Sequence, residues 1–334
     1  MKILVIGGTI FLGRAFVRNA LEKGHIVTLF NRGKSNPDLF PTAEHLIGDR
    51  DGNLSILEGR KWDAVVDTCG YAPRVVQQSA ELLAGAVNHY TFVSTVSVYA
   101  DLGQPGIDEN APMGTIEDET TEEITGETYG PLKALCEQAA TKAMPGRVLV
   151  VRPGLIVGPH DVSDRFTYWV QRISRGGEVL APEPASMPVE FIDVRDLAEW
   201  ILRMIKIRQI GIYNAVGPGR PMTLGQFLNA CKMVSGSDAR FVWAEGAFLL
   251  QNEVQPWSEM PMWLPTDDPE FSGMFAINGE KALTAGLVHR SVEATIGDTL
   301  TWAKTRPDGY EMRAGISGQR EAELLRLWKA SISK

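Results

Sequence analysis

The sequence predicts an α/β fold in which a doubly wound parallel sheet carries a smaller C-terminal lobe. In the first half of the chain, short runs rich in β-branched residues alternate with stretches of helical apolar spacing. These runs are apolar throughout, as expected for strands that are buried on both faces between helices. The length of 334 residues also exceeds the size at which a single core stops growing, so we expect a second lobe.

The strands of the first half follow in a regular order. The first, at 2–7, ends in glycine and precedes an amphipathic helix around 12–23. The other expected strands of this half are 25–31, 45–49, 62–68, 89–95 and 147–154. Apolar residues at helical spacing lie between the fourth and fifth of these six runs, and we expect right-handed crossovers throughout.

The second half of the chain is less regular. Residues 191–207 read as a short strand and a helix, and 211–217 as another strand, both able to rejoin the main sheet. We therefore assign 1–159 to the sheet domain, with 191–217 rejoining it. Residues 160–190 and 218–334 form the second lobe, which we expect to bind a substrate.

Composition excludes several classes of protein. Apolar residues make up 44%, and no apolar run approaches the ~18 residues of a membrane helix, so we expect no membrane partner. Acidic residues outnumber basic ones by 41 to 33, so no overall basic footprint for nucleic acid is present. The three cysteines are far apart without a CxxC pair, which fits free thiols in a reducing cytoplasm. The five histidines show no zinc spacing, and no metal is expected.

The turn after the first strand reads Gly7-Gly8-Thr9-Ile10-Phe11-Leu12-Gly13. Glycines between a strand and a helix bring backbone N–H groups and the helix N-terminus up to a pyrophosphate. The turn therefore predicts a Rossmann-type, dinucleotide-binding domain over 1–159. We assign the cofactor to Gly7, Thr9, Ile10, Phe11, Leu12 and Gly13. Ile10 replaces the middle glycine of both common spacings, so its Cβ is expected to alter the phosphate geometry.

The end of the second strand predicts which dinucleotide binds. An NAD site usually has an acidic residue here, but this chain has Asn31, followed by Arg32. Without a carboxylate to repel a 2′-phosphate, Arg32 can pair with that phosphate and stack on adenine. We predict NADP(H), with NAD(H) as the alternative; a solvated turn without a ligand is the other interpretation.

Two further strand ends are expected to contact the cofactor. Asp49 follows the third strand and can accept a hydrogen bond from the adenine amino group. Thr68, Cys69 and Gly70 follow the fourth strand and can line the nicotinamide ribose.

A Tyr-x-x-x-Lys pair, Tyr129 and Lys133, begins a helix after the fifth strand. The spacing places both side chains on one helix face. The lysine charge is expected to lower the tyrosine pKa, so that the phenol exchanges a proton with a substrate hydroxyl near neutral pH. Lys133 can also hold the nicotinamide ribose. At the end of the fifth strand Ser94, Thr95 and Ser97 offer hydroxyls to a substrate oxygen that gains negative charge.

Together these motifs resemble the extended short-chain dehydrogenase/reductases, the NAD-dependent epimerase/dehydratase group. The resemblance includes the turn at 7–13, YGPLK at 129–133, RPGLIVGP at 152–159 and FIDVRDLA at 191–198. It implies a catalytic Thr95, with Tyr129 as acid/base, Lys133 as its partner and Pro153 beside the nicotinamide. Family members are often dimers, so a homodimer is expected. GGTIFLGR with NRGK is similar to an atypical branch that includes plastid RNA-binding relatives.

Departures from the family pattern narrow the function. Val96 and Ser97 replace the Asp-Glu pair of sugar-nucleotide dehydratases, which argues against a dehydratase. Gly154 and Val189 stand where nucleotide-sugar members tend to have Asn and Arg, so a nucleotide-sugar substrate is in doubt. For a small-molecule substrate we assign Ser97, Tyr99 and Trp169, although large aromatics are more often core.

Three functions remain open from the sequence. The first is an NADP(H)-dependent oxidoreductase that acts on a secondary alcohol or ketone, such as a sugar or polyol. The second is a sugar epimerase that keeps NAD tightly bound. The third is a non-catalytic RNA-binding or regulatory protein on the same fold, against which the net charge of −8 argues.

Overall fold

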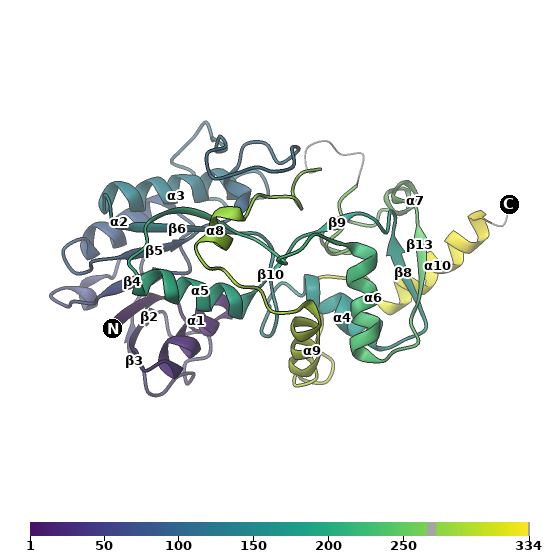
Figure 1. The fold of residues 1–334 in the computed structure, drawn as a ribbon, viewed down its shortest axis with the longest axis horizontal. Coiled ribbons are helices and arrows are strands. Elements are labelled where there is room, and N and C mark those ends of the chain that lie inside the picture. Colours follow the sequence, from purple (N-terminus) through teal and green to yellow (C-terminus); the bar gives the residue numbers. More distant parts are fainter. Residues whose placement is uncertain (266–271, 333–334) are drawn as a thin grey trace.

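A parallel sheet forms the N-terminal part of the molecule in the computed structural model, which describes residues 1–265 and 272–332 (Figure 1). The strand order is β11-β6-β5-β4-β1-β2-β3, and the neighbouring strands pair in parallel. The strands are β1 (Lys2–Ile6), β2 (Ile26–Asn31), β3 (Glu44–Ile47), β4 (Ala64–Asp67), β5 (Tyr90–Val93), β6 (Val148–Pro153) and β11 (Gly211–Ala215). The order reverses beside β1, which confirms the predicted doubly wound fold and places a crevice at the carboxyl ends of β1 and β4.

Helices cover both faces of this sheet. On one face α1 (Phe11–Glu22) packs against α5 (Val194–Lys206); on the other α2 (Pro73–Leu83) packs against α3 (Tyr129–Ala143). The strands explain this arrangement, because successive side chains point to opposite faces. In β1, Ile3 and Val5 join the core under α1 and α5, whereas Leu4 and Ile6 join the core under α2 and α3.

The C-terminal lobe has its own core, built mainly on three helices: α4 (Arg165–Ser174), α6 (Leu224–Ser235) and α9 (Val292–Ala303). A parallel pair of strands, β8 (Glu178–Pro182) and β13 (Arg240–Ala244), completes the lobe together with α7 (Gly246–Gln251) and α10 (Gly318–Ile332). Helix α6 has a full capping box, in which Thr223 and Gln226 satisfy each other's backbone N–H groups.

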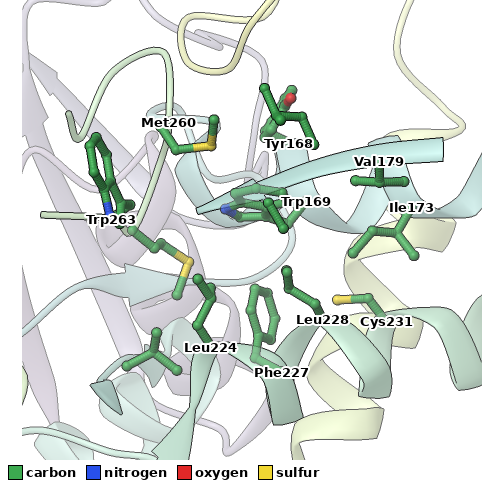
Figure 2. Packing of buried hydrophobic residues seen from close by; sticks show 14 of the residues in the cluster. Tyr168, Trp169, Ile173, Val179, Leu224, Phe227, Leu228, Cys231, Met260 and Trp263 are labelled. Carbon is green, nitrogen blue, oxygen red and sulfur yellow. The ribbon is translucent and has the colours of Figure 1, made fainter. Parts of the chain in front are cut away.

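Trp169 belongs to this core, so our prediction that it contacts the substrate is wrong. Its side chain is 0% exposed, and its Nε1 donates a hydrogen bond to the carbonyl oxygen of Pro261 at 2.8 Å. Figure 2 shows the ring among the buried side chains of α4 and α6. The helical spacing that buries one face of α4 also buries this tryptophan.

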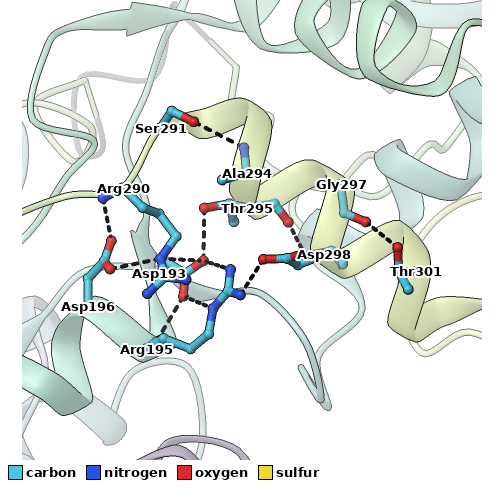
Figure 3. Close-up of polar contacts among 11 residues, drawn as sticks. Asp193, Arg195, Asp196, Arg290, Ser291, Ala294, Thr295, Gly297, Asp298 and Thr301 are labelled. Atoms are coloured by element: carbon cyan, nitrogen blue, oxygen red, sulfur yellow. Dashed lines mark hydrogen bonds and ion pairs between the residues drawn. The ribbon is translucent and has the colours of Figure 1, made fainter.

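Short strand pairs and a polar network connect the two parts of the molecule. The pairs are β7 (Ile156–Val157) with β10 (Ile192–Asp193), and β9 (Pro188–Val189) with β12 (Met222–Thr223). At the start of α5, Asp193 accepts hydrogen bonds from the Arg195 guanidinium and, at 2.8 Å, from the Thr295 hydroxyl of α9 (Figure 3). Asp196 likewise holds Arg290, just before α9. These bonds tie the lobe to the sheet domain.

Candidate functional site

The glycine turn joins β1 to α1 at the carboxyl edge of the sheet. Gly7 and Gly8 have φ values of 99° and 94°, a conformation that side chains rarely adopt. A Cβ on Gly13 would lie 2.8 Å from the backbone of Gly8, so only glycine lets α1 start so close to the turn. The free N–H groups of the first helical turn therefore face the crevice, where a pyrophosphate can accept from them.

A cleft of about 610 Å³ opens over this turn. It runs from the end of β2 and β3 to the start of α3. The predicted cofactor residues that line it are Gly7, Thr9, Ile10, Phe11, Leu12, Gly13, Asn31, Arg32, Asp49, Thr68, Cys69, Tyr129 and Lys133. Gly70 and Pro153 do not line it; Gly70 acts through its carbonyl oxygen, and Pro153 is buried at the end of β6. The cleft has the size and the donors that an extended dinucleotide requires.

One end of the cleft is basic. The Asn31 amide donates to the Gly7 carbonyl and accepts from the Gly33 N–H, so Asn31 fixes the loop between β2 and β3 onto the glycine turn. Arg32 and Lys34 line the cleft, are exposed, and have no ion pair with any residue in 1–265 or 272–332. Asp49 also lines the cleft and is exposed.

A buried ion pair that the sequence analysis missed lies beneath the cleft. Arg50 donates to both carboxylate oxygens of Asp67, at 2.7 and 2.8 Å, and to the Ser79 hydroxyl at 2.6 Å. Asp67 is 0% exposed and also accepts from the Tyr90 hydroxyl at 2.8 Å. Burial alone would raise the pKa of Asp67, but Arg50, Tyr90 and the Cys69 N–H outweigh burial and hold the pKa below its usual value. Arg50 thus forms part of the cleft wall as a fixed positive charge.

Helix α3 brings Tyr129 to the opposite end of the cleft. The helix packs on the short turn η2 (Val96–Val98), and a Cβ on Gly130 would lie 2.0 Å from the Ser97 carbonyl oxygen. Glycine at 130 therefore allows the close approach that sets Tyr129 beside Thr95. Burial raises the pKa of Tyr129, and the Thr95 hydroxyl opposes this. The expected lowering of the Tyr129 pKa by Lys133 is therefore wrong.

Lys133 is fixed by backbone groups. Its Nζ donates to the carbonyl oxygens of Gly70 and Val93, both at 2.7 Å, and lies 4.2 Å from the centre of the Phe92 ring. Burial lowers the pKa of Lys133 to about 8, although nearby groups such as Asp67 raise it. An ammonium group has three protons to donate, so one remains for a ligand in the cleft.

The hydroxyl groups near Tyr129 have different partners. Thr95 accepts from the Ser97 N–H and donates to the Ser97 hydroxyl, both at 3.1 Å. Ser94 lines the cleft, and its buried Oγ has no hydrogen-bond partner within the described residues. The Tyr99 hydroxyl instead donates to Asn214 at 2.6 Å, and the side chain is 4% exposed. Our assignment of Tyr99 to the substrate is therefore wrong, because Tyr99 joins η2 to β11.

No group of three His, Cys, Asp or Glu residues within 1–265 and 272–332 is arranged to hold a metal ion. In the same part of the chain, no helix combines the length and the apolar character that crossing a membrane requires.

Comparison with known proteins identifies relatives over most of the chain. Residues 3–215 match the sequence profile of the NAD dependent epimerase/dehydratase family. The chain is 26% identical to the chloroplast stem-loop binding protein of 41 kDa b of Arabidopsis thaliana, over 70% of this chain and 63% of that protein, so it spans less than two thirds of that relative's length. It is 22% identical to the UDP-glucose 4-epimerase of Neisseria meningitidis serogroup A, over 93% of this chain and 99% of that protein.

Solved structures share the fold. The UDP-glucose 4-epimerase from Bifidobacterium longum in complex with NAD+ and UDP has a TM-score of 0.66 and 18% identity, covering 93% of this chain and 100% of that chain. The UDP-glucuronic acid 4-epimerase from Bacillus cereus in complex with NAD has a TM-score of 0.65 and 15% identity, covering 91% and 99%. At such identities the likeness extends to the fold and no further.

Proposed function

Because this chain belongs to the NAD dependent epimerase/dehydratase family, we propose that it transfers a hydride between NADP(H) and a secondary alcohol or ketone. The family makes it an NAD(P)-dependent enzyme of the short-chain dehydrogenase/reductase type, an oxidoreductase or an epimerase. One observation carries the proposal. A single cleft has the glycine turn in its middle and the Tyr129–Lys133 pair at one end, and at its other end lie Arg32 and Lys34, two cations without an ion pair among the described residues. A small-molecule substrate, such as a sugar or polyol, is the expected partner.

The residues present fit a nicotinamide dinucleotide. The first helical turn of α1 offers N–H groups to the pyrophosphate. The remaining proton of the Lys133 ammonium can bind a ribose hydroxyl, and the unpartnered Ser94 hydroxyl lies in the same wall. When bound, the nicotinamide would accept or supply the hydride.

In the proposed reaction Tyr129 moves the proton. For a ketone, the phenol donates its proton to the carbonyl oxygen as the hydride arrives at the carbon; for an alcohol, the direction is reversed. Thr95 would donate to the reacting oxygen once its hydroxyl proton turns away from Ser97, and Lys133 would orient the ribose. Burial raises the pKa of Tyr129, so the phenol is protonated at neutral pH, as donation to a carbonyl oxygen requires.

Preference for NADP(H) rests on the basic end of the cleft. A 2′-phosphate carries negative charge, and the Arg32 guanidinium can donate two parallel hydrogen bonds to it. Asn31 presents no carboxylate, and its amide is already bonded to Gly7 and Gly33. NAD(H) remains the alternative, because Asp49 lies in the same part of the cleft.

Nucleotide titration tests the cofactor proposal. We expect the protein to bind NADPH at least about tenfold more tightly than NADH. Arg32→Ala should remove most of that difference, because it weakens NADPH much more than NADH, which loses only the stacking on adenine. Arg60→Ala is the control, at a partly exposed arginine that pairs with Glu44 outside the cleft, and should change neither affinity. Tighter binding of NADH, or an equal loss of both nucleotides in Arg32→Ala, would contradict the proposal.

A variant of Tyr129 tests the proton transfer. In a screen of carbonyl substrates that follows NADPH oxidation, Tyr129→Phe should lower the rate at least ~10²-fold. Its NADPH affinity should remain close to that of the unmodified protein, since only a hydroxyl is removed. Full activity in Tyr129→Phe would rule out the mechanism.

The second candidate is a sugar epimerase with tightly bound NAD. The similarity to the Neisseria UDP-glucose 4-epimerase, which extends over 93% of this chain, favours it. An epimerase would use the same three residues, but it would return the hydride to the opposite face of the substrate and would not release its cofactor.

A further inference from the structure

A second cavity lies beside the glycine turn, between the sheet domain and the C-terminal lobe. Its volume is about 450 Å³. Thr9, Ile10 and Phe11 line both this cavity and the cofactor cleft. The other wall comes from the end of α9 and the segment that follows it, residues 302–313. Nothing in the proposed hydride transfer uses this cavity.

The cavity contains positive charge without matching negative charge. Arg14 and Arg313 line it, and neither guanidinium has an ion pair or hydrogen bond with another residue of the described chain. Arg306, the third arginine, pairs with Asp164, which is 0% exposed and does not line the cavity. Asp161 is the one carboxylate among the residues that line the cavity, so cations outnumber anions there.

Arg306 is held rigidly. Its guanidinium lies 4.2 Å from the ring centres of both Trp302 and Tyr310, between the two aromatic residues. Asp164 accepts from Arg306, from the Tyr310 hydroxyl at 3.1 Å and from the Arg313 N–H at 3.0 Å. The Arg306 side chain is 8% exposed, and its Nη1 is buried without a hydrogen-bond partner in the described structure. The cavity is therefore preorganised, and one of its donors is unsatisfied.

Two titratable groups in the wall respond to this environment. Burial lowers the pKa of His160 to about 4, and Arg14, Arg18 and Arg306 act in the same direction. Burial raises the pKa of Asp161 to about 6. Both carboxylate oxygens of Asp161 are bonded to Ser163, through its N–H and its hydroxyl. At neutral pH the imidazole is uncharged and Asp161 is still mostly ionised, so the cavity retains more positive charge from its arginines than negative charge.

We propose that this cavity binds the phosphate group of a small phosphorylated molecule, held by Arg14 from α1 and by Arg313 from the C-terminal lobe. Guanidinium groups are suited to phosphate because they donate two parallel hydrogen bonds to it. The bound group would join the lobe to the helix that begins at the glycine turn. The cavity is larger than a phosphate alone and has the volume of a small-ligand site.

The phosphate could belong to a free metabolite or to the dinucleotide in the neighbouring cleft. We assign the site to a separate molecule, because Arg14, Arg306 and Arg313 line this cavity and none of the three lines the cofactor cleft. The two sources differ in one respect: a separate phosphate binds when the cleft is already filled, whereas a phosphate that belongs to the dinucleotide site does not.

Calorimetric titration with inorganic phosphate, at constant ionic strength, tests the assignment on the full chain. The unmodified protein is titrated alone and with saturating NADPH. Arg313→Ala and Arg313→Glu remove or reverse a charge on an exposed side chain, so both should fold normally. Arg326→Ala is the control, because Arg326 is exposed on α10 and lies outside the cavity.

We expect the unmodified protein to bind one phosphate per chain, with the same affinity in the presence and absence of NADPH. Phosphate binding should be at least about tenfold weaker in Arg313→Ala and undetectable in Arg313→Glu. Arg326→Ala should bind phosphate as the unmodified protein does. Loss of phosphate binding in the presence of NADPH would place the anion in the cofactor cleft and overturn the assignment. No saturable binding at millimolar phosphate, or an unchanged affinity in Arg313→Ala, would also overturn it. If the protein bound no nicotinamide nucleotide, the proposed function would fail, but the comparison of Arg313→Ala with Arg326→Ala would still decide the phosphate site.

Discussion

Gly130 positions the catalytic tyrosine, and replacing it with alanine measures how closely α3 must approach η2. The added Cβ would lie 2.0 Å from the Ser97 carbonyl oxygen, whereas close carbon–oxygen contacts in proteins are about 3.3 Å. The helix and the turn must therefore separate by roughly 1 Å. Since the obstacle is backbone, no side-chain rotation can relieve the clash.

The free energy of this substitution has two opposing parts. Alanine is favoured over glycine inside a helix by up to about 1 kcal/mol. Forcing packed elements apart costs typically about 1–3 kcal/mol. We expect Gly130→Ala to lose about 1–2 kcal/mol of unfolding free energy in urea denaturation. Because Tyr129 moves away from Thr95, the rate of carbonyl reduction should also fall by about 10²-fold.

Gly126→Ala is the matched control, since a Cβ at 126 would meet nothing within 4 Å. This variant should retain both the stability and the rate of the unmodified protein. If Gly130→Ala were as stable and as active as Gly126→Ala, the close packing of α3 on η2 would not position Tyr129, and the reasoning would be refuted.

Three further predictions concern charge. Asp67→Asn leaves the buried Arg50 guanidinium without its counter-ion and should lower the unfolding free energy in urea by about 3–5 kcal/mol. Asp51→Asn, at an exposed ion pair, should leave the urea midpoint nearly unchanged. Equal urea midpoints for the two variants would contradict this prediction. Because the pKa of Lys133 is lowered to about 8, NADPH affinity should fall as the pH rises through about 8. The neutral amine has only two protons, and the carbonyl oxygens of Gly70 and Val93 accept both. The same pH profile in Lys133→Met would show that another group titrates. Filter binding at physiological salt should detect no RNA, because the net charge is −8, whereas micromolar binding that weakens with salt would support an RNA-binding role.

The strands and helices of the sheet domain could be predicted from the sequence, because apolar residues are spaced differently along a buried strand and along a helix. Continuous apolar runs correspond to β1, β2 and β6, and the turn that follows β1 lines the cleft. Each of these features depends on residues close together in the chain.

Features that depend on residues far apart in the chain were either not predicted from the sequence or predicted wrongly. Arg50 follows β3 and Asp67 ends β4, and their pairing becomes visible only when these two strands are placed in the sheet. Trp169 and Tyr99 are aromatic residues near expected site segments, and sequence alone does not distinguish a ring in a core from a ring in a pocket. The raised pKa of Tyr129 also requires the structure, since the degree of burial outweighs the i,i+4 lysine.

Whether the protein exchanges its cofactor or retains it is decided most directly by the nucleotide content of the purified protein. The protein is denatured, and any released nicotinamide nucleotide is identified by mass and absorbance. An NADP(H)-dependent reductase should release no stoichiometric NAD, and should bind added NADPH more tightly than NADH. Release of one NAD per chain would contradict the proposed function and would indicate an epimerase that keeps its cofactor.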